Sequence, residues 1–127
     1  MSIKSNISGL LRKMNLLSSA EKARFYLQKS KYKKDNDAFK KEHPDFVLPP
    51  EFFIYETYRL SYKWYYEDGK NSAEEIVTLL SKYYDLSKAN TRILDWGCGP
   101  GRIVRHFPAL LPNAELHGTD YNENYIK

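Results

Sequence analysis

The chain has little of what marks a secreted or membrane protein. Its 127 residues include a single cysteine, Cys98, so no disulfide can form within the chain and a reducing compartment suits it. No apolar run approaches the roughly 18 residues that a membrane-spanning helix needs. The start of the chain carries positive charge with no long apolar segment behind it, which argues against a signal peptide. These absences predict a cytoplasmic protein with no membrane span.

The excess of positive charge is confined to the first third of the chain. Residues 1–43 hold eleven Lys or Arg against four acids, whereas residues 44–127 hold nine against twelve. Such a basic arm could bind nucleic acid or another anionic surface, or its lysines could simply form a solvated helix face. We favour the solvated face, because no arginine cluster and no interleaved glycine accompany the lysines. These lysines are Lys29, Lys31, Lys33, Lys34, Lys40 and Lys41.

Residues 1–43 are expected to form a basic helical arm. A short apolar helix face is predicted from the spacing of Leu10, Leu11, Met14 and Leu17. Ser18 and Glu21 have the spacing of a capping box, which predicts that a helix begins at Ser18 and runs to about Lys41. Its end is set by His43-Pro44, because the residue before a proline disfavours helix. The residues expected to face inward are Ala23, Tyr26, Leu27 and Phe39.

Residues 44–88 form an aromatic-rich lead-in that is also expected to be helical. Offsets of three and four place four tyrosines on one helical face: Tyr55, Tyr58, Tyr62 and Tyr65. We expect most of these rings to form core, the alternative being that one of them walls a ligand pocket. Asp68-Gly69 predicts a turn. Ser72 and Glu75 have the spacing of a second capping box, which would open a helix through about Tyr84.

The stretch from Arg92 to Ile103 carries the predicted ligand site. Two apolar residues and an acid precede three glycines at every second position, in the order Ile93, Leu94, Asp95, Gly97, Gly99 and Gly101. This pattern predicts a buried strand over about 92–95, a tight turn in which glycines take positive φ, and a helix from about Arg102. A P-loop is excluded because no Lys-Ser or Lys-Thr pair follows the glycines. The dinucleotide fingerprint is excluded because position 102 is not glycine.

A second predicted strand, from Ala114, also ends in an acid. Asp120 lies nineteen positions after Gly101, near the offset at which a carboxylate meets ribose hydroxyls in Rossmann units. An acid just before the glycines favours a ligand with an ammonium group over an anionic pyrophosphate. The segment from Ile93 to Gly101, taken with Asp120, resembles the first motif and the ribose acid of the class I S-adenosylmethionine-dependent methyltransferases. Leu48-Pro49-Pro50 and the aromatic stretch loosely resemble the lead-in of a bacterial branch of that family.

The resemblance implies an α/β fold in which residues 89–127 begin a Rossmann-like methyltransferase sheet with two parallel strands, preceded by a helical N-terminal region. It implies a small-molecule methyl donor, S-adenosyl-L-methionine, as the cofactor. The acid of the first motif would help to hold the methionine ammonium, and the residue after the ribose acid would pack on adenine. The implied cofactor-binding residues are Asp95, Gly97, Cys98, Gly99, Gly101, Asp120 and Tyr121.

The resemblance names no catalytic residue, because the acceptor-binding residues and any base usually follow the fourth strand in this family. The acceptor is therefore unknown. Cys98 is not expected to be a nucleophile, because no general base is placed near it in the sequence. A metal site is not expected either, because His106 and His117 have no ligand spacing.

Sheets of this methyltransferase class usually have seven strands, so the chain is expected to be the front portion of a longer enzyme. Two strands alone leave both sheet edges unpaired. The isolated chain should therefore bind the cofactor weakly or not at all, lack transferase activity, and offer edges for self-association. Two alternatives stay open. One is a non-catalytic module whose basic arm binds RNA or a protein partner, and the other is a half-domain of a dinucleotide-dependent oxidoreductase.

Overall fold

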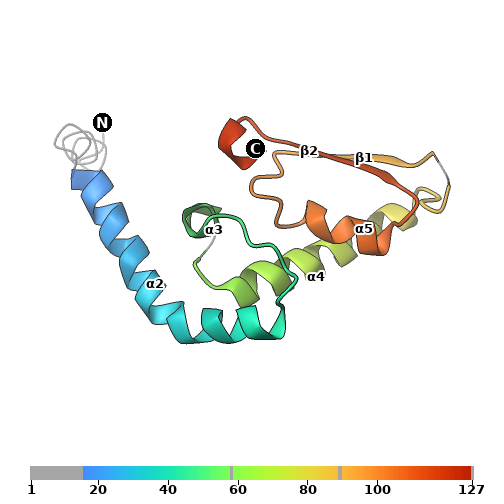
Figure 1. Ribbon diagram of the computed structural model, residues 1–127. Helices are drawn as coiled ribbons and strands as arrows, with labels where there is room; N and C mark the ends of the chain where they lie inside the picture. The colour runs from blue at the N-terminus through green and yellow to red at the C-terminus, as the bar shows by residue number, and fades with distance from the viewer. Residues whose placement is uncertain (1–15, 58, 89, 127) are drawn as a thin grey trace.

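A helical N-terminal part is followed by a small parallel sheet in the computed structural model, which describes residues 16–57, 59–88 and 90–126 (Figure 1). The elements in chain order are α2 (Leu16–Glu42), α3 (Glu51–Thr57), α4 (Tyr62–Ser81), β1 (Arg92–Trp96), the 3-10 helix η1 (Val104–His106), α5 (Phe107–Leu110), β2 (Glu115–Thr119) and the 3-10 helix η2 (Glu123–Tyr125). Figure 1 shows the two strands lying above α5 and the end of α4, with α2 running away from them.

The long helix α2 corrects part of the prediction for the basic arm. It already contains Ser18, so Ser18 does not cap it, and it ends at Glu42, directly before His43-Pro44, as predicted. Of the residues expected to face inward, Phe39 is buried, whereas Ala23, Tyr26 and Leu27 are exposed. The predicted apolar face at Leu10, Leu11 and Met14 lies outside the described residues.

Two polar side chains of α2 face the inside of the molecule. The amide of Asn36 donates to the carbonyl of Leu60 at 2.9 Å and accepts from the N–H of Tyr62 at 2.9 Å. The Oε1 of Gln28 accepts from the N–H of Leu60 at 2.8 Å. These bonds satisfy the backbone between α3 and α4 where it is buried against α2. The inner face of α2 is therefore partly polar, which a search for apolar periodicity does not find.

The aromatic lead-in forms two helices instead of one continuous face. The first, α3, ends at Thr57, and α4 begins after Ser61, whose hydroxyl accepts from the N–H of Trp64 at 3.3 Å as an N-cap. The second, α4, continues through Asp68-Gly69 and past Ser72, so the predicted turn and the predicted second cap are both wrong.

The aromatic core was predicted in part. Tyr62 and Tyr65 are buried, as expected, and Tyr55 packs against the same cluster. Tyr58 lies outside the described residues. The cluster of buried side chains consists of Phe39, Ile54, Leu60, Tyr62 and Tyr65. It joins α2, α3 and α4 to one another, and none of its members belongs to a strand.

The strands β1 and β2 pair in parallel, with Arg92 opposite Glu115 and Trp96 opposite Thr119. This agrees with the predicted pair of parallel strands. The prediction that the first strand is buried is wrong, because every residue of β1 is half-buried or exposed. One face of the sheet carries the half-buried Ile93 and Leu116. On the other face Trp96 is 84% exposed and Leu94 is 56% exposed. This second face therefore presents apolar surface to solvent.

The crossover between the strands differs from the predicted helix. Turns continue from Gly99 to Ile103, and only η1 and the four-residue α5 are helical. Pro108 lies in the first turn of α5, where its missing N–H costs no hydrogen bond, so it does not end a helix there. No helix in the described part of the chain combines the length and apolarity needed to cross a membrane.

Candidate functional site

Residues 97–101 form a tight turn after β1 that we call the glycine corner. Gly97, Gly99 and Gly101 have φ angles of 81°, 54° and 78°, as the sequence predicted. Residues with a Cβ rarely adopt such angles. A Cβ built on Gly97 would meet nothing within 4 Å, so the backbone at this position faces open space. The first residue of the corner therefore leaves room for a ligand to approach the main chain.

The end of β2 holds the first half of the corner. The N–H groups of Gly97 and Cys98 both donate to the carbonyl of Thr119, at 2.7 and 3.0 Å. The N–H of Gly99 donates to Oδ2 of Asp120 at 2.9 Å. The fold thus brings Asp120 onto the glycines, twenty-one positions from Gly99.

The carboxylate of Asp120 is only partly satisfied by these contacts. Its second oxygen, Oδ1, accepts from the N–H of Asn122 at 2.8 Å. Each carboxylate oxygen has two lone pairs, so each can accept one further hydrogen bond. A pair of adjacent hydroxyls is a suitable donor set for those positions.

Asp95 is the second acid at the corner, at the carboxyl end of β1 beside Gly118 of β2. Its carboxylate is half-buried, and this burial raises its pKa above the usual value for aspartate. No hydrogen bond or ion pair to Asp95 occurs among residues 16–57, 59–88 and 90–126. A half-buried carboxylate without a partner favours a cationic or hydrogen-donating ligand.

The thiol of Cys98 lies close enough to Asp95 and Asp120 to be affected by their charges. Burial, together with the charges of Asp95 and Asp120, raises the pKa of the thiol. The sulfur lies 2.9 Å from the place where a Cβ on Gly118 would stand. A thiol held in its protonated form is a weak nucleophile, so the geometry agrees with a packing role for Cys98.

The helix α4 holds the second half of the corner. The hydroxyl of Tyr65 donates to the carbonyl of Pro100 at 2.8 Å, and Asp68 forms an ion pair with Arg102. Gly69 lies against the backbone of Arg102. The sequence did not predict these contacts. The only signal was a glycine within a helical pattern, Gly69, which the sequence analysis assigned to a turn.

The helix α3 and the segment after β2 border the corner on another side. A methyl carbon of Thr57 lies 3.8 Å from the Cβ position of Gly99. The ring of Tyr125 packs edge-on against Phe53, with ring centres 5.0 Å apart. Tyr121, by contrast, is 99% exposed, so the ring of this predicted site residue lies in solvent.

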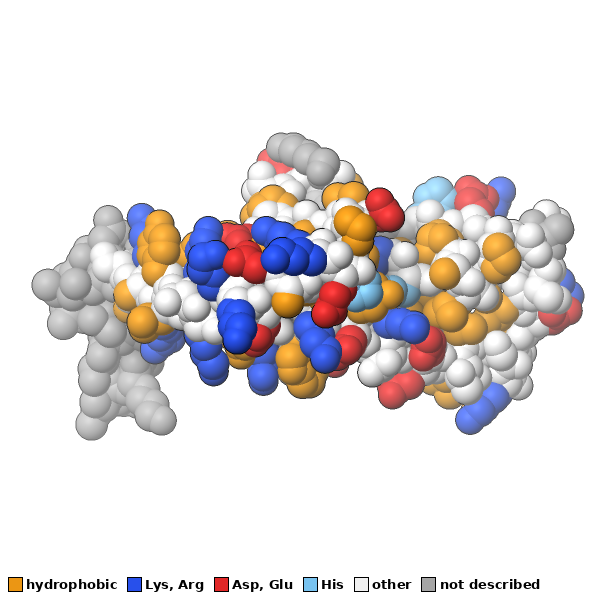
Figure 2. Space-filling model, turned by 60° about the horizontal axis from the view of Figure 1, so that its bottom comes forward, with side chains coloured by type: hydrophobic (Ala, Val, Ile, Leu, Met, Phe, Trp, Pro, Cys, Tyr) orange, Lys and Arg blue, Asp and Glu red, His pale blue; other side chains and the backbone are white. Residues whose placement is uncertain are grey.

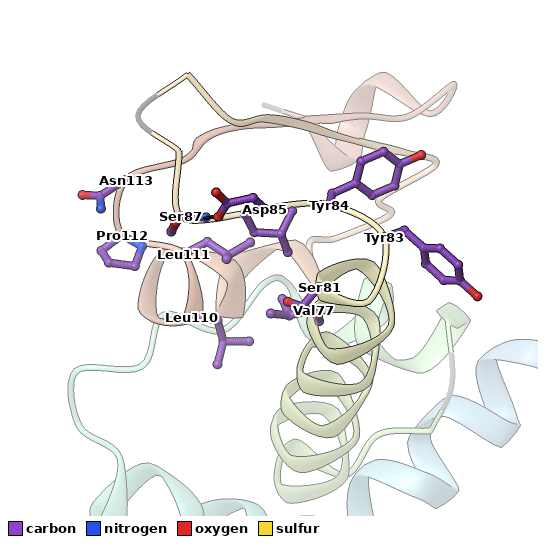
Figure 3. Close-up of a pocket in the computed structure, with 11 residues that line it drawn as sticks. Val77, Ser81, Tyr83, Tyr84, Asp85, Ser87, Leu110, Leu111, Pro112 and Asn113 are labelled. Atoms are coloured by element: carbon purple, nitrogen blue, oxygen red, sulfur yellow. Dashed lines mark hydrogen bonds between the residues drawn. The ribbon is translucent and has the colours of Figure 1, made fainter.

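A separate hollow of about 680 Å³ lies at the opposite ends of the strands. Figure 3 shows it between the end of α4 and the end of α5, with the loops that precede β1 and β2 around it. Its lining includes Val77 and Ser81 of α4 and Leu111 after α5. The hollow contains none of the predicted site residues.

The lysines of α2 are interspersed with acidic side chains on the face that Figure 2 shows. Figure 2 shows Lys and Arg side chains spread along the helical part with acidic side chains between them. Lys33 pairs with Asp37 at 2.7 Å, and Lys29 pairs with Glu51 at 2.6 Å. Within the described ranges, no three His, Cys, Asp or Glu side chains are grouped so that they could hold a metal ion.

Comparison with known proteins relates part of the chain to a methyltransferase. Over 67 residues the chain is 36% identical to the malonyl-[acyl-carrier protein] O-methyltransferase of Bacillus cytotoxicus. The alignment covers 53% of this chain and 23% of that protein, so the chain matches about a quarter of its relative's length. No protein-family model matches the chain. No solved structure matches it significantly.

Proposed function

We propose that the glycine corner binds S-adenosyl-L-methionine and that this chain is the cofactor-binding part of a class I methyltransferase. The observation that carries the proposal is the meeting of Asp95, Asp120 and three positive-φ glycines at the carboxyl ends of two parallel strands. Ligands of open α/β sheets bind at this end of the strands. The partial identity to a methyltransferase supports the same conclusion.

Four of the predicted residues have separate physical roles in this proposal. Gly97 lets the main chain approach the methionine half of the ligand, because a side chain there would fill the open space. Asp95 holds the ammonium group of the ligand. The positive charge of that group is the partner that the half-buried carboxylate does not have in the free protein. Asp120 accepts hydrogen bonds from the two ribose hydroxyls through the remaining lone pairs of its carboxylate. The exposed ring of Tyr121 covers one face of the adenine.

The chemistry of the complete enzyme is transfer of a methyl group from sulfonium to a nucleophile by in-line displacement. A sulfonium is a good leaving group, so the protein mainly supplies alignment and a site from which water is excluded. The residues of this chain would contribute the donor side of that alignment. The acceptor is left unassigned.

The two-stranded sheet limits what the chain does by itself. Its edges are unpaired among the described residues, and one of its faces exposes Leu94 and Trp96. We infer that the isolated chain binds the cofactor weakly, lacks transferase activity, and self-associates through this exposed face and its edges. Low-micromolar binding of S-adenosyl-L-methionine by the purified chain would contradict that inference.

Nuclear magnetic resonance of the labelled chain tests the proposed site. Adding S-adenosyl-L-methionine is expected to shift the amide signals of Gly97, Gly99 and Gly101, with a dissociation constant of about 1 mM or weaker. Asp120→Asn should reduce these shifts severalfold. The matched control is Glu115→Gln, which removes a carboxylate at the other end of β2 and should leave the shifts unchanged.

Two results would contradict the proposed function. One is the absence of any shift at the corner with the cofactor at about 10 mM. The other is an equal response to NADH, which would indicate a dinucleotide site.

A further inference from the structure

The two halves of the glycine corner are held by different parts of the fold. The carbonyl of Thr119 and the carboxylate of Asp120 fix Gly97, Cys98 and Gly99 through their N–H groups. The second half has its own supports on the opposite side, where Tyr65 of α4 reaches Pro100. The contact spans thirty-five positions of sequence and is buried.

We propose that Tyr65 is a positioning residue whose hydroxyl, through the carbonyl of Pro100, keeps the glycine corner in its ligand-binding shape. This assignment rests on the proposed function. Tyr65 itself does not need to touch the ligand, because it acts on the backbone that does.

The peptide plane between Pro100 and Gly101 explains why one hydrogen bond has this effect. Because the peptide is planar, the direction of the Pro100 carbonyl is coupled to the φ angle of Gly101. Glycine takes either sign of φ about equally readily, so the sequence alone does not select the observed 78°. Donation from Tyr65 favours it, since turning the plane would leave a buried carbonyl without a donor. The N–H of the same peptide donates to the carbonyl of Cys98 at 3.0 Å, and the bond from Tyr65 holds the carbonyl side of the plane.

Arg105 supports the next peptide of the corner, between Gly101 and Arg102. Its Nε donates to the carbonyl of Gly101 at 3.0 Å. Its guanidinium lies over the ring of Tyr65, 5.3 Å from the ring centre, and over that of Phe46, 4.8 Å from the centre. The carbonyls of two successive corner residues are thus held by side chains, one from Tyr65 of α4 and one from Arg105 of η1.

The chain offers a closely matched control for Tyr65. Tyr62 lies one turn earlier in α4, is 2% exposed against 1% for Tyr65, and also donates one hydrogen bond from its hydroxyl. Its acceptor is Oε1 of Glu51 at 2.6 Å, in α3 and not in the corner. Tyr62→Phe therefore removes the same group from the same helix without touching Pro100.

The experiment compares Tyr65→Phe with Tyr62→Phe by amide hydrogen exchange and by cofactor titration. In the free protein, Tyr65→Phe is expected to speed the exchange of the Gly99 and Gly101 amides about fivefold relative to Tyr62→Phe, after correction for global stability. The response of the corner to S-adenosyl-L-methionine should fall by a similar factor in Tyr65→Phe alone. Global unfolding in urea is measured for both variants, so that a simple loss of stability is recognised.

The outcomes separate this assignment from the proposed function. Equal exchange and equal cofactor response in the two variants would overturn the role of Tyr65. A wild-type corner that responds to the cofactor, together with an unaltered response in Tyr65→Phe, would overturn it as well and leave the proposed function intact. A wild-type corner that ignores the cofactor, together with faster exchange in Tyr65→Phe alone, would support the control of the corner by Tyr65 and reject the proposed function.

Discussion

Gly69 of α4 lies directly against the carbonyl oxygen of Arg102, so close that a Cβ at position 69 would come within 2.2 Å of it. The contact brings the backbone of a long helix against the turn that carries the candidate site. It also explains why a helix former such as alanine does not occupy this buried position. The nearest atom belongs to the main chain, which cannot move aside as the end of a flexible side chain can.

Gly69→Ala should destabilise the protein although alanine favours helix over glycine by about 1 kcal/mol. We expect a net loss of about 2 kcal/mol in the free energy of unfolding, because the helix and the corner must separate. Asn71→Ala, at an exposed position of the same helix, is the control and should be neutral or slightly stabilising. Urea denaturation measures both variants. A stable Gly69→Ala protein would show that α4 and the corner do not pack as described.

Asp95→Asn should have opposite effects on stability and on binding. The free energy of unfolding should rise by roughly 0.5 kcal/mol, a small gain because the unpartnered carboxylate is still partly solvated. The response of the corner to S-adenosyl-L-methionine should fall, since the ligand's ammonium loses its counter-charge. Asp45→Asn removes an exposed carboxylate and should change neither quantity measurably. A variant that binds as well as the wild type would remove Asp95 from the site.

The raised pKa of Asp95 also gives this prediction a pH dependence. Because the folded-state pKa lies above the unfolded value, the folded protein binds this proton more tightly. The contribution of Asp95 to the free energy of unfolding therefore falls as the pH rises from the usual pKa of aspartate towards the raised pKa of Asp95 in the folded protein. Asp95→Asn should lack that contribution, which urea denaturation at several acidic pH values measures.

His106→Phe should weaken the loss of stability in mild acid. Burial, with a smaller contribution from the charge of Arg105, lowers the pKa of His106 below 6.5, and its buried Nε2 has no hydrogen-bond partner among the described residues. The unfolded chain therefore binds a proton more readily, and stability is lost as the pH falls through 6.5 towards the lowered value. Phenylalanine keeps a ring against Phe46 and Tyr66 but cannot titrate.

Unfolding in urea at about pH 5.5 and about pH 7.5 checks the role of His106. The difference in the free energy of unfolding between the two conditions should be smaller for His106→Phe than for the wild type. The imidazole signals of His106 give its titration directly. A wild-type signal that titrates above 6.5 would contradict the predicted direction.

Trp96→Lys should reduce association between copies of the chain. The indole is 84% exposed on the open face of the sheet, beside an unpaired edge, so burial against another copy is favourable. Sedimentation velocity over a range of concentrations should show dimers or larger species for the wild type and fewer of them for the variant. Tyr26→Lys, at a 65% exposed position of α2 away from the sheet, is the control. A wild type that stays monomeric throughout would contradict the inferred self-association.

The successes and failures of the sequence analysis follow from the range of the interactions involved. The two strands and a turn with glycines at positive φ were predicted, because the strand pattern and the tolerance of glycine for positive φ are local properties. Ser18 and Ser72 both have a capping spacing, yet each lies where a helix is already under way. The cap that forms is Ser61, because the break after Thr57 leaves the N–H groups at the start of α4 without partners.

The amino-acid sequence by itself determined which residues can stand at the glycine corner, because residues with a Cβ rarely adopt its backbone angles. The place of Asp120, directly after β2, was also set by sequence, through the length of the crossover. Tertiary structure alone decided that Tyr65 and Gly69 would meet the corner and that Asn36 would face inward. Those choices depend on the packing of segments more than twenty positions apart, and no local pattern of residues records which faces will meet.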